Sequence, residues 1–411
     1  MVYTFETSLA ADQVRISIRD GSFAISIGEE AGFSFDGEGR LMTATIDDAV
    51  HKRALDHRFV RKSHVGKKRM NVDLTVEETD RLVQSVLRWI QKVLDVLPKA
   101  ADTEIVEALN LALTWDGAAY QEDIRRFHSV YTPIGILPPD QYMALVLQAT
   151  EGCHYNRCTF CRFYRETPFR IKPAAEFRRH VNLAIDLIGK GAPLRRSVFL
   201  GDANALVTSQ RRLLEFFSAL NEAFAFAPSH LSGRPLAAWL KRNPRGKRGI
   251  YSFIDAFTGH AKPASEFLEL RELHLKRIYI GMESGHNPLL DFVAKPSHPE
   301  HVRLVVENAR KAGINVAVIV MTGIGGKRFA AGHIRDSIST LNKMGLGAGD
   351  LIYLSPFRED PESDYAAIAR DTGLDPLCYE EGITQAAHIR AGLNTSDGVK
   401  VAVYDVDEFV Y

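Results

Sequence analysis

The feature that most limits the fold of this chain is a repeated alternation of apolar, strand-like runs with amphipathic helical stretches after residue 135. The runs lack a clean polar alternation, which is typical of strands buried on both faces of a parallel sheet. Right-handed crossovers between such units predict an α/β fold, either a partial (β/α)6 barrel or a doubly wound open sheet. The strand candidates are 142–149, 196–202, 249–257, 277–284, 315–324 and 350–357.

The first 135 residues have a different pattern of apolar and polar residues. Alternating β-type stretches at 13–27 and 33–47 carry turn signals at Asp20-Gly21 and Asp36-Gly37, and a capping box at Thr75 and Glu78 opens a helix that Pro98 ends. We therefore expect an N-terminal accessory α+β region over 1–135, a core over 136–360 and a short C-terminal extension over 361–411. The last fifteen residues alternate like a strand, which is compatible with pairing to the N-terminal strands or with covering the barrel mouth.

Unusual residues stand at the ends of the strand candidates. In either α/β architecture, ligands gather at the carboxyl ends of the parallel strands. The sequence therefore predicts a functional site at that edge. The residues are the cysteine-rich stretch after the first strand, GDAN (201–204), Asp255, MESG (282–285), GIGG (323–326) and LSPF (354–357).

Three of the four cysteines lie within nine positions, at Cys153, Cys158 and Cys161. A long chain with so few cysteines does not form a disulfide framework. Three thiolates can hold three irons of a [4Fe-4S] cluster and leave the fourth iron open. They can instead hold zinc with His154, although structural zinc sites usually use two separated ligand pairs and no second CxxC occurs. Unligated thiols are the third alternative.

The overall composition restricts the binding partners and the cellular location that we expect. The chain has 51 basic and 51 acidic residues, so net charge gives no general attraction to nucleic acid or acidic membranes. The N-terminus lacks the basic and apolar segments of a signal peptide, and no apolar run approaches the roughly 20 residues of a membrane span. We expect a soluble cytoplasmic protein with no membrane association.

The cysteine stretch, with Phe160 directly before its last cysteine, resembles the cluster loop of the radical S-adenosylmethionine (SAM) superfamily. The spacing here is C-x4-C-x2-C, one residue longer in its first gap than the common C-x3-C-x2-C. GDAN stands where the family has its glycine-rich GGE-type motif, IYIGMESG…LLDFVAK resembles the fourth-strand segment of the HemN/Elp3-like branch, and VMTGIGG resembles the fifth-strand motif. The resemblance covers about residues 140–357.

This resemblance implies a partial (β/α)6 barrel and an oxidoreductase that uses a [4Fe-4S] cluster and SAM. An electron from a reductant such as flavodoxin or ferredoxin would cleave SAM, and the resulting 5′-deoxyadenosyl radical would take a hydrogen atom from a substrate. A small organic, possibly anionic, metabolite is the first expectation for the substrate, and RNA or tRNA is the second.

The resemblance also implies roles for individual residues. Cys153, Cys158 and Cys161 would ligate the cluster, and Phe160 would contact adenine. Near the SAM amino group the resemblance implies Gly201, Asp202 and Asn204, with Asp202 replacing the family's usual acidic residue. Near the ribose or carboxylate it implies Glu283 and Ser284, and on the adenine side Gly323, Ile324 and Ser355. Tyr164 and Cys378 are candidates to return a hydrogen atom to a substrate radical.

Other features leave alternatives. The basic run 51–69 is compatible with a solvated or structural loop, with a small anionic substrate, or with a nucleic acid, which its single aromatic residue Phe59 disfavours. Lys327 and Arg328 could bind a substrate anion near the site or simply start a helix.

No further cysteine group and no D-x-H-x-x-G stretch occur, so neither an auxiliary cluster nor a standard cobalamin domain is expected. The rival interpretations are a zinc-stabilised nucleic-acid-binding module and an electron-transfer protein, which would usually need four cysteine ligands.

Overall fold

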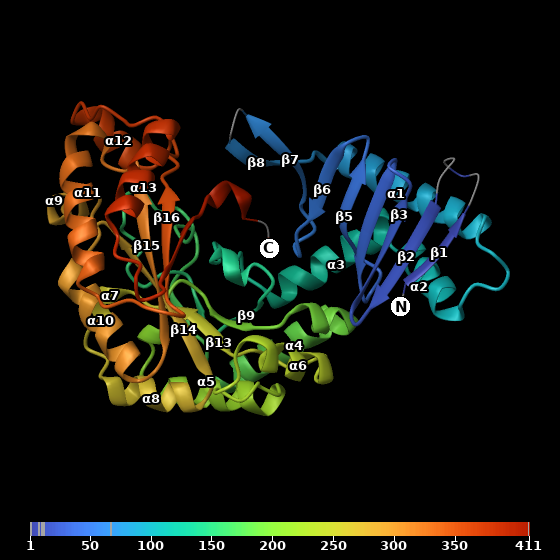
Figure 1. Cartoon of the computed structure of the whole chain (residues 1–411), viewed down its shortest axis with the longest axis horizontal. Coiled ribbons are helices and arrows are strands. Elements are labelled where there is room, and N and C mark those ends of the chain that lie inside the picture. Colours follow the sequence, from blue (N-terminus) through green and yellow to red (C-terminus); the bar gives the residue numbers. More distant parts are fainter. Residues whose placement is uncertain (1, 7–8, 10–12, 66–67, 410) are drawn as a thin grey trace.

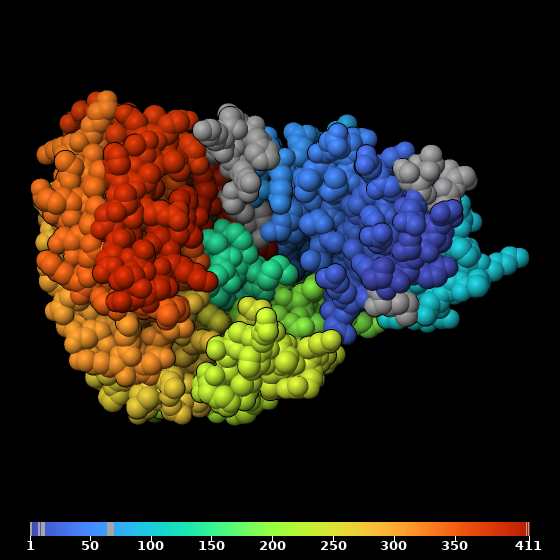
Figure 2. All heavy atoms as spheres, viewed as in Figure 1, coloured from blue at the N-terminus to red at the C-terminus, as the bar shows by residue number. Residues whose placement is uncertain are grey.

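The computed structural model describes residues 2–6, 9, 13–65, 68–409 and 411. Within these residues the chain forms an eight-stranded N-terminal antiparallel sheet and a seven-stranded parallel sheet that is partly closed into a barrel. Figure 1 shows the two sheets side by side, with helices around the outside of the parallel one. Figure 2 shows the same arrangement as two lobes that meet near the middle of the molecule. Among the described residues, no helix is both long and apolar enough to span a membrane.

The N-terminal sheet is an eight-stranded meander in the described residues, with each strand paired to the next along the chain. Alternation places Ile16, Ile25 and Phe35 in a core that α1 and α2 cover. The Thr75–Glu78 capping box that opens α1 is confirmed. The elements are β1 Val2–Glu6, β2 Gln13–Arg19, β3 Ser22–Ile27, β4 Ala31–Asp36, β5 Leu41–Ile46, β6 Ala49–Arg53, β7 Phe59–Val65, β8 Lys68–Asp73, α1 Val76–Asp95, α2 Thr103–Leu113 and α3 Gly117–Val130.

The parallel sheet contains all six strands that the sequence predicts, in the order β17-β16-β15-β14-β13-β12-β9. The six predicted strands are mostly buried, as their continuous apolar character predicts, whereas the additional β17 is mostly exposed. They are β9 Leu145–Gln148, β12 Val198–Gly201, β13 Ile250–Phe253, β14 Leu275–Glu283, β15 Asn315–Thr322, β16 Leu351–Pro356 and the additional β17 Lys400–Val403.

Helices connect these strands and cover the outside of the sheet (Figure 1). The predicted helix between Pro173 and Gly189 is α4, with those two residues as its caps. The helices of this part are α4 Ala174–Ile188, α5 Gln210–Ala223, α6 Gly233–Arg242, α7 Ala256–Gly259, α8 Ala264–Glu272, α9 Asn287–Phe292, α10 Pro299–Lys311, α11 Gly326–Asn342, α12 Asp364–Asp371 and α13 Tyr379–Gly392. The fold is thus α/β, a partial barrel with an N-terminal accessory region.

Two segments differ from the expectations. The interpretation of 51–69 as a loop is wrong, because its described residues lie mainly in β6, β7 and β8, where cross-strand pairs such as His51–Arg61 continue the meander. These strands carry polar residues on both faces of the sheet, so the sequence shows no alternation of apolar and polar residues that would predict them. At the C-terminus, β17 pairs in parallel with β16 rather than with an N-terminal strand. The chain then returns toward the N-terminal region, where the Leu55 N–H donates to the Tyr411 carbonyl at 2.8 Å.

Candidate active site

The three cysteines lie on a closed loop, residues 152–169, called the cysteine loop below. Two short antiparallel strands, β10 Thr150–Glu151 and β11 Arg170–Ile171, pair at its base. Glu151 strengthens that base through ion pairs with Arg170 and with Lys172, whose Nζ lies 2.6 Å from the Glu151 carboxylate. Gly152 has φ +70, and a Cβ there would lie 2.4 Å from the Thr167 carbonyl oxygen. The loop therefore needs glycine at its first position.

The longer first gap of the cysteine motif has a structural explanation. Asn156 has φ +48, a left-handed conformation that asparagine adopts more readily than most residues. Its backbone N–H points to the Cys153 Sγ at 3.4 Å, and its side-chain amide donates to the Tyr164 carbonyl at 2.8 Å. The extra residue is therefore absorbed by a local turn, and Cys158 and Cys161 remain on the same loop as Cys153.

The cysteine loop also docks on the C-terminal end of α9. The Tyr155 hydroxyl donates to the Ala294 carbonyl at 2.8 Å, and the Thr159 N–H donates to the Val293 carbonyl at 3.1 Å. Burial raises the pKa of Cys158 to about 11 and also raises the pKa of Cys161. Both thiols therefore hold their protons at neutral pH until a metal displaces them.

A cavity of about 230 Å³ opens at the carboxyl ends of the parallel strands, and all three motif cysteines line it. Each of the six predicted strands or the turn behind it contributes to its wall, so the prediction of a site at this edge agrees with the geometry. The lining residues used below are Asn204, Phe253, Asp255, Phe257, Glu283, Lys295, Ile319, Met321, Ser355 and Tyr404.

A buried ion pair faces the cysteines across this cavity. Lys295 Nζ lies 3.0 Å from Glu283 Oε1, and their side chains are only 15% and 11% exposed. Glu283 has φ +61, and a Cβ on Gly281 would lie 2.4 Å from its Oε1. Despite burial, the carboxylate and the nearby thiols Cys158 and Cys161 raise the pKa of Lys295. The cavity therefore holds a fixed positive charge beside the cysteine loop.

A second polar group surrounds Asp255 at the N-terminus of α7. The Thr258 N–H and hydroxyl donate to this carboxylate at 2.7 and 2.6 Å, and the Asn204 amide also donates to it. His154 Nε2 lies 3.6 Å from Asp255 Oδ2, and its ring stacks on Phe257. Both ring nitrogens of His154 and the Asn204 Oδ1 are buried and have no hydrogen-bond partner among the described residues, which is unfavourable unless a ligand supplies one.

Several predicted site residues lie on the cavity wall. They are Cys153, Cys158, Cys161, Phe160, Tyr164, Asn204, Glu283 and Ser355. Tyr164 is 5% exposed, and its hydroxyl is hydrogen-bonded to Asp202. Because Tyr164 connects the cysteine loop to the end of β12, its hydroxyl already has a structural partner.

Other predicted residues are placed elsewhere. Asp202 is 4% exposed and faces Tyr164 and Gln148 instead of the cavity, and burial raises its pKa to about 7. Ser284 bonds to His333 Nδ1 at 2.7 Å. Ile324 packs in a small apolar core with Leu289 and Phe329. Gly201 and Gly323 are likewise not among the lining residues.

Three more candidates also lie away from the cavity. Cys378 is exposed at the N-cap of α13. Lys327 and Arg328 lie in the first turn of α11, where Lys327 pairs with Asp375 at 2.9 Å. These two cations therefore start a helix and do not face the site.

The sequence analysis did not assign a role in the site to Lys295. It also did not predict that His154 and Asp255 lie close to each other. Lys295 is the last residue of the quoted segment IYIGMESG…LLDFVAK, so its position was visible but its contact with Glu283 was not. The missing signal was spatial, because eleven residues, which include α9, separate the two charges in the chain.

The cavity fits an iron–sulfur cluster and SAM in its chemistry. Three thiols, a fixed ammonium group and unpartnered polar atoms of His154 and Asn204 face one space. In the described part of the chain, no three His, Cys, Asp or Glu side chains are arranged to hold a single metal ion. A four-iron cluster does not need its three ligands to meet at one ion, because each thiolate binds a different iron.

Comparison with sequence models of protein families gives a match to this part of the chain. Residues 147–330 match the sequence model described as "Radical SAM superfamily". No curated protein matches the chain in sequence.

The solved structures to which the chain is similar include the following three, and the titles of the first two name radical SAM enzymes. Coproporphyrinogen III oxidase (HemN) from Escherichia coli has 12% identity and a TM-score of 0.40, over 68% of this chain and 56% of that chain. The methyltransferase TsrM from Kitasatospora setae has 15% identity and a TM-score of 0.41, over 66% and 58%. An archaeal Elp3 from Methanocaldococcus infernus has 11% identity and a TM-score of 0.41, over 66% and 57%. The chain thus spans less than two thirds of each of these structures.

The matched range contains the whole cysteine loop and the strands β12 to β15. Enzymes of the matched family use a [4Fe-4S] cluster and SAM, the two groups that the chemistry of this cavity fits. The match over residues 147–330, slightly less than half of the chain, thus identifies a radical SAM domain in this protein.

Proposed function

We propose that Cys153, Cys158 and Cys161 bind a [4Fe-4S] cluster at this cavity and that SAM binds beside it. The observation that carries this proposal is the meeting of the three thiols with the ends of six parallel strands around one space. When bound, the cluster and SAM supply a 5′-deoxyadenosyl radical that takes a hydrogen atom from the substrate. The low potential this needs depends on thiolate ligation and on the surroundings of the sulfur atoms.

The chain's own residues would bind and orient these groups. The Lys295 ammonium can pair with a carboxylate while Glu283 keeps it in place, and the Asn204 Oδ1 can accept from an ammonium or hydroxyl group. Phe160, now beside Met321 in an apolar group, can cover one face of an adenine ring. Asp202 supports the cysteine loop through Tyr164 and does not enter this set.

For the substrate, we propose a small and largely apolar organic molecule. Away from the cysteines and the polar groups, the wall of the cavity is apolar, with Phe253, Ile254, Ile319, Met321 and Tyr404. The one lysine of the wall, Lys295, is already paired with Glu283. An apolar wall also excludes water, which protects a radical from side reactions.

The test is an anaerobic assay of the purified chain. We expect the protein reconstituted with iron and sulfide to form 5′-deoxyadenosine from SAM in the presence of dithionite, as measured by chromatography. Cys158→Ala should abolish the product and the iron–sulfur absorbance. Cys378→Ala is the matched control, because this exposed cysteine lies away from the cavity, and it should leave both unchanged.

Two outcomes would overturn the proposal. One is a protein that carries about one zinc ion, builds no four-iron cluster and leaves SAM intact. The other is a Cys158→Ala variant that still forms 5′-deoxyadenosine at the rate of the unaltered protein. The first outcome would favour a zinc-stabilised binding module instead.

A further inference from the structure

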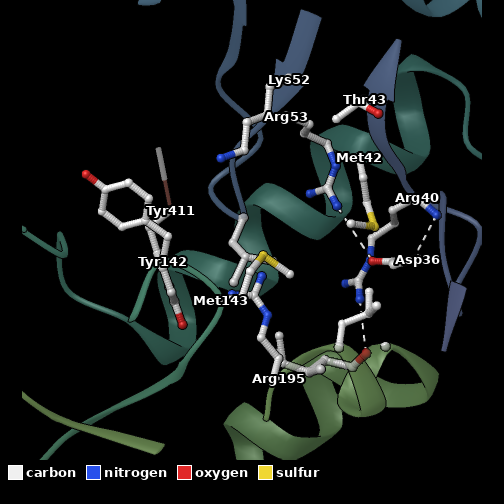
Figure 3. Close-up of a pocket in the computed structure, with 14 residues that line it drawn as sticks. Asp36, Arg40, Met42, Thr43, Lys52, Arg53, Tyr142, Met143, Arg195 and Tyr411 are labelled. Carbon is white, nitrogen blue, oxygen red and sulfur yellow. Dashed lines mark hydrogen bonds and ion pairs between the residues drawn. The ribbon is translucent and has the colours of Figure 1, made fainter. Parts of the chain in front are cut away.

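A second cavity, of about 70 Å³, lies where the N-terminal sheet meets the barrel. Its wall combines residues of β5 and β6, the turn before β9, the segment after α4, and Tyr411 (Figure 3). It shares no lining residue with the candidate active-site cavity. Tyr142 and Met143 precede β9, so this space lies near the amino end of that strand, whereas the cysteine loop follows its carboxyl end.

The inner charges of this cavity compensate one another. Asp36 accepts from Arg40 Nε at 2.8 Å and lies 3.6 Å from Arg53 Nη2. Arg40 also bonds to Asp123 at 3.1 Å. Burial lowers the pKa of His57, another partner of Asp123, to about 4, so this histidine is neutral at pH 7. The two buried arginines are therefore paired with two buried aspartates, and the half-exposed Arg126 also pairs with Asp123 at 3.2 Å.

Two further cations on the wall have no such partner. Lys52 and Arg195 have no carboxylate within 4 Å in the part of the chain that the structure describes. Arg195 donates to the Ala144 carbonyl at 3.2 Å and lies over the Tyr411 ring, neither of which neutralises it. Figure 3 shows Lys52 on the N-terminal side of the hollow and Arg195 on the barrel side.

These two charges also act on each other. Burial is the main cause that lowers the pKa of Lys52, and the positive charges of Lys62 and Arg195 lower it further. Like charges held beside a partly enclosed space are unfavourable unless an anion lies between them. The arrangement therefore has the charge of an anion-binding site.

We propose that this cavity binds a phosphoryl dianion between Lys52 and Arg195. A guanidinium group pairs well with a tetrahedral oxyanion, and an ammonium group supplies a second charge-assisted hydrogen bond. The volume limits the charged part of the ligand to a few atoms. The neighbouring Met42, Leu55 and Met143 offer apolar contact to a short organic substituent. The source is either inorganic phosphate or the phosphate end of a small monoester.

The bound dianion would connect parts of the chain that are far apart in sequence. It would contact the N-terminal sheet through Lys52 and the barrel through Arg195, beside the C-terminal Tyr411. Binding should therefore stabilise the junction of the two lobes. This inference does not depend on the radical SAM chemistry, because the two cavities are separate.

Calorimetric titration of the holoprotein at constant ionic strength tests the proposal, with inorganic phosphate in one arm and glycerol 3-phosphate in the other. We expect saturable binding of one dianion per chain and a rise in melting temperature that chloride does not produce. Lys52→Met should weaken binding about tenfold or more, the effect of losing one charged hydrogen bond. Lys52→Arg should retain it within about threefold, because the charge remains.

Lys241→Met is the matched control, because this exposed lysine of α6 is not on the cavity wall, and it should bind like the unaltered protein. Without phosphate, Lys52→Met should melt at a temperature equal to or above that of the unaltered protein, since it removes a repulsion. Tighter binding of glycerol 3-phosphate would identify a monoester as the source, and tighter binding of phosphate would identify the free ion. Failure of both to bind saturably, or equal weakening by Lys241→Met, would overturn the proposal.

Discussion

At the scale of single residues, the candidate active site depends on charges that are buried in pairs. Glu283 and Lys295 are the clearest case, because each is nearly enclosed and each is the other's partner. A buried ion pair adds little stability by itself, but removal of one member leaves an uncompensated charge. The pair is therefore best understood as a fixed electrostatic feature beside the cysteines.

Lys295→Met should lower the free energy of unfolding by about 3 kcal/mol, because Glu283 would remain buried without a partner. The double variant Lys295→Met with Glu283→Gln should recover part of that loss, as measured by urea denaturation. Lys311→Met is the control, since its pair with Glu307 is exposed and should contribute less than about 0.5 kcal/mol. A double variant that is less stable than Lys295→Met would contradict this account.

At the scale of elements, the cysteine loop shows how backbone geometry presents side chains. The β10–β11 pair closes its base, and Gly152 and Asn156 supply the two left-handed turns that shape its start. None of these shaping features involves a cysteine side chain as a ligand. The thiol positions therefore depend on residues that have no contact with a metal.

Gly152→Ala tests this dependence. We expect it to destabilise the protein by about 2–3 kcal/mol and to reduce the iron bound after reconstitution, because the added Cβ would clash with the Thr167 carbonyl. Gly373→Ala is a matched control: its φ is +60, but a Cβ there would have no atom within 4 Å. That change should cost about 1 kcal/mol and leave iron binding unchanged. Equal effects of both changes would show that the clash is not what matters.

At the scale of the whole molecule, Arg40 joins the two lobes. This β4–β5 turn residue donates to the Leu187 and Ile188 carbonyls at the end of α4, at 2.9 and 3.1 Å. Arg40→Met should therefore destabilise the chain by about 3–5 kcal/mol, because Asp36 and Asp123 would lose a buried partner. Urea denaturation measures this. Arg125→Met, which breaks an exposed pair with Glu122, should change the unfolding free energy by no more than about 1 kcal/mol.

The pH dependence of stability is also a property of the whole chain. Burial lowers the pKa of His57, His180 and His333 to about 4 in each case. Between pH 4 and the usual value near 6.5, the unfolded chain binds protons that the folded chain does not, so stability decreases as pH decreases through this window. Asp202, whose pKa burial raises to about 7, acts in the opposite sense, but burial also lowers the pKa of His51, His274 and His301, which act in the same sense as the first three histidines.

Urea midpoints should accordingly be lower at pH 5 than at pH 7. His180→Gln should reduce the slope, because glutamine can still accept from the Gln148 N–H and donate to the Val130 carbonyl without titrating. His128→Gln is the control, since this histidine is exposed on α3. A midpoint that is constant or higher at pH 5 would contradict the expectation.

The sequence by itself determined the six core strands, the capped helices α1 and α4, and the loop that carries three cysteines. These features are local, because hydrophobic periodicity, capping residues and close cysteine spacing are all visible within a few residues. The family match over 147–330 includes the cysteine loop, α4 and the strands β12 to β15.

Only the tertiary structure decided which side chains face the cavity. Asp202 and Asn204 are two residues apart, yet one supports Tyr164 while the other lines the site. Lys295 meets Glu283, and Lys52 approaches Arg195, only because distant segments pack together. The same is true of β17, whose partner strand could not be chosen from its alternation alone. The physical reason is that a side chain's direction and charge environment depend on contacts between segments, which a local pattern does not specify.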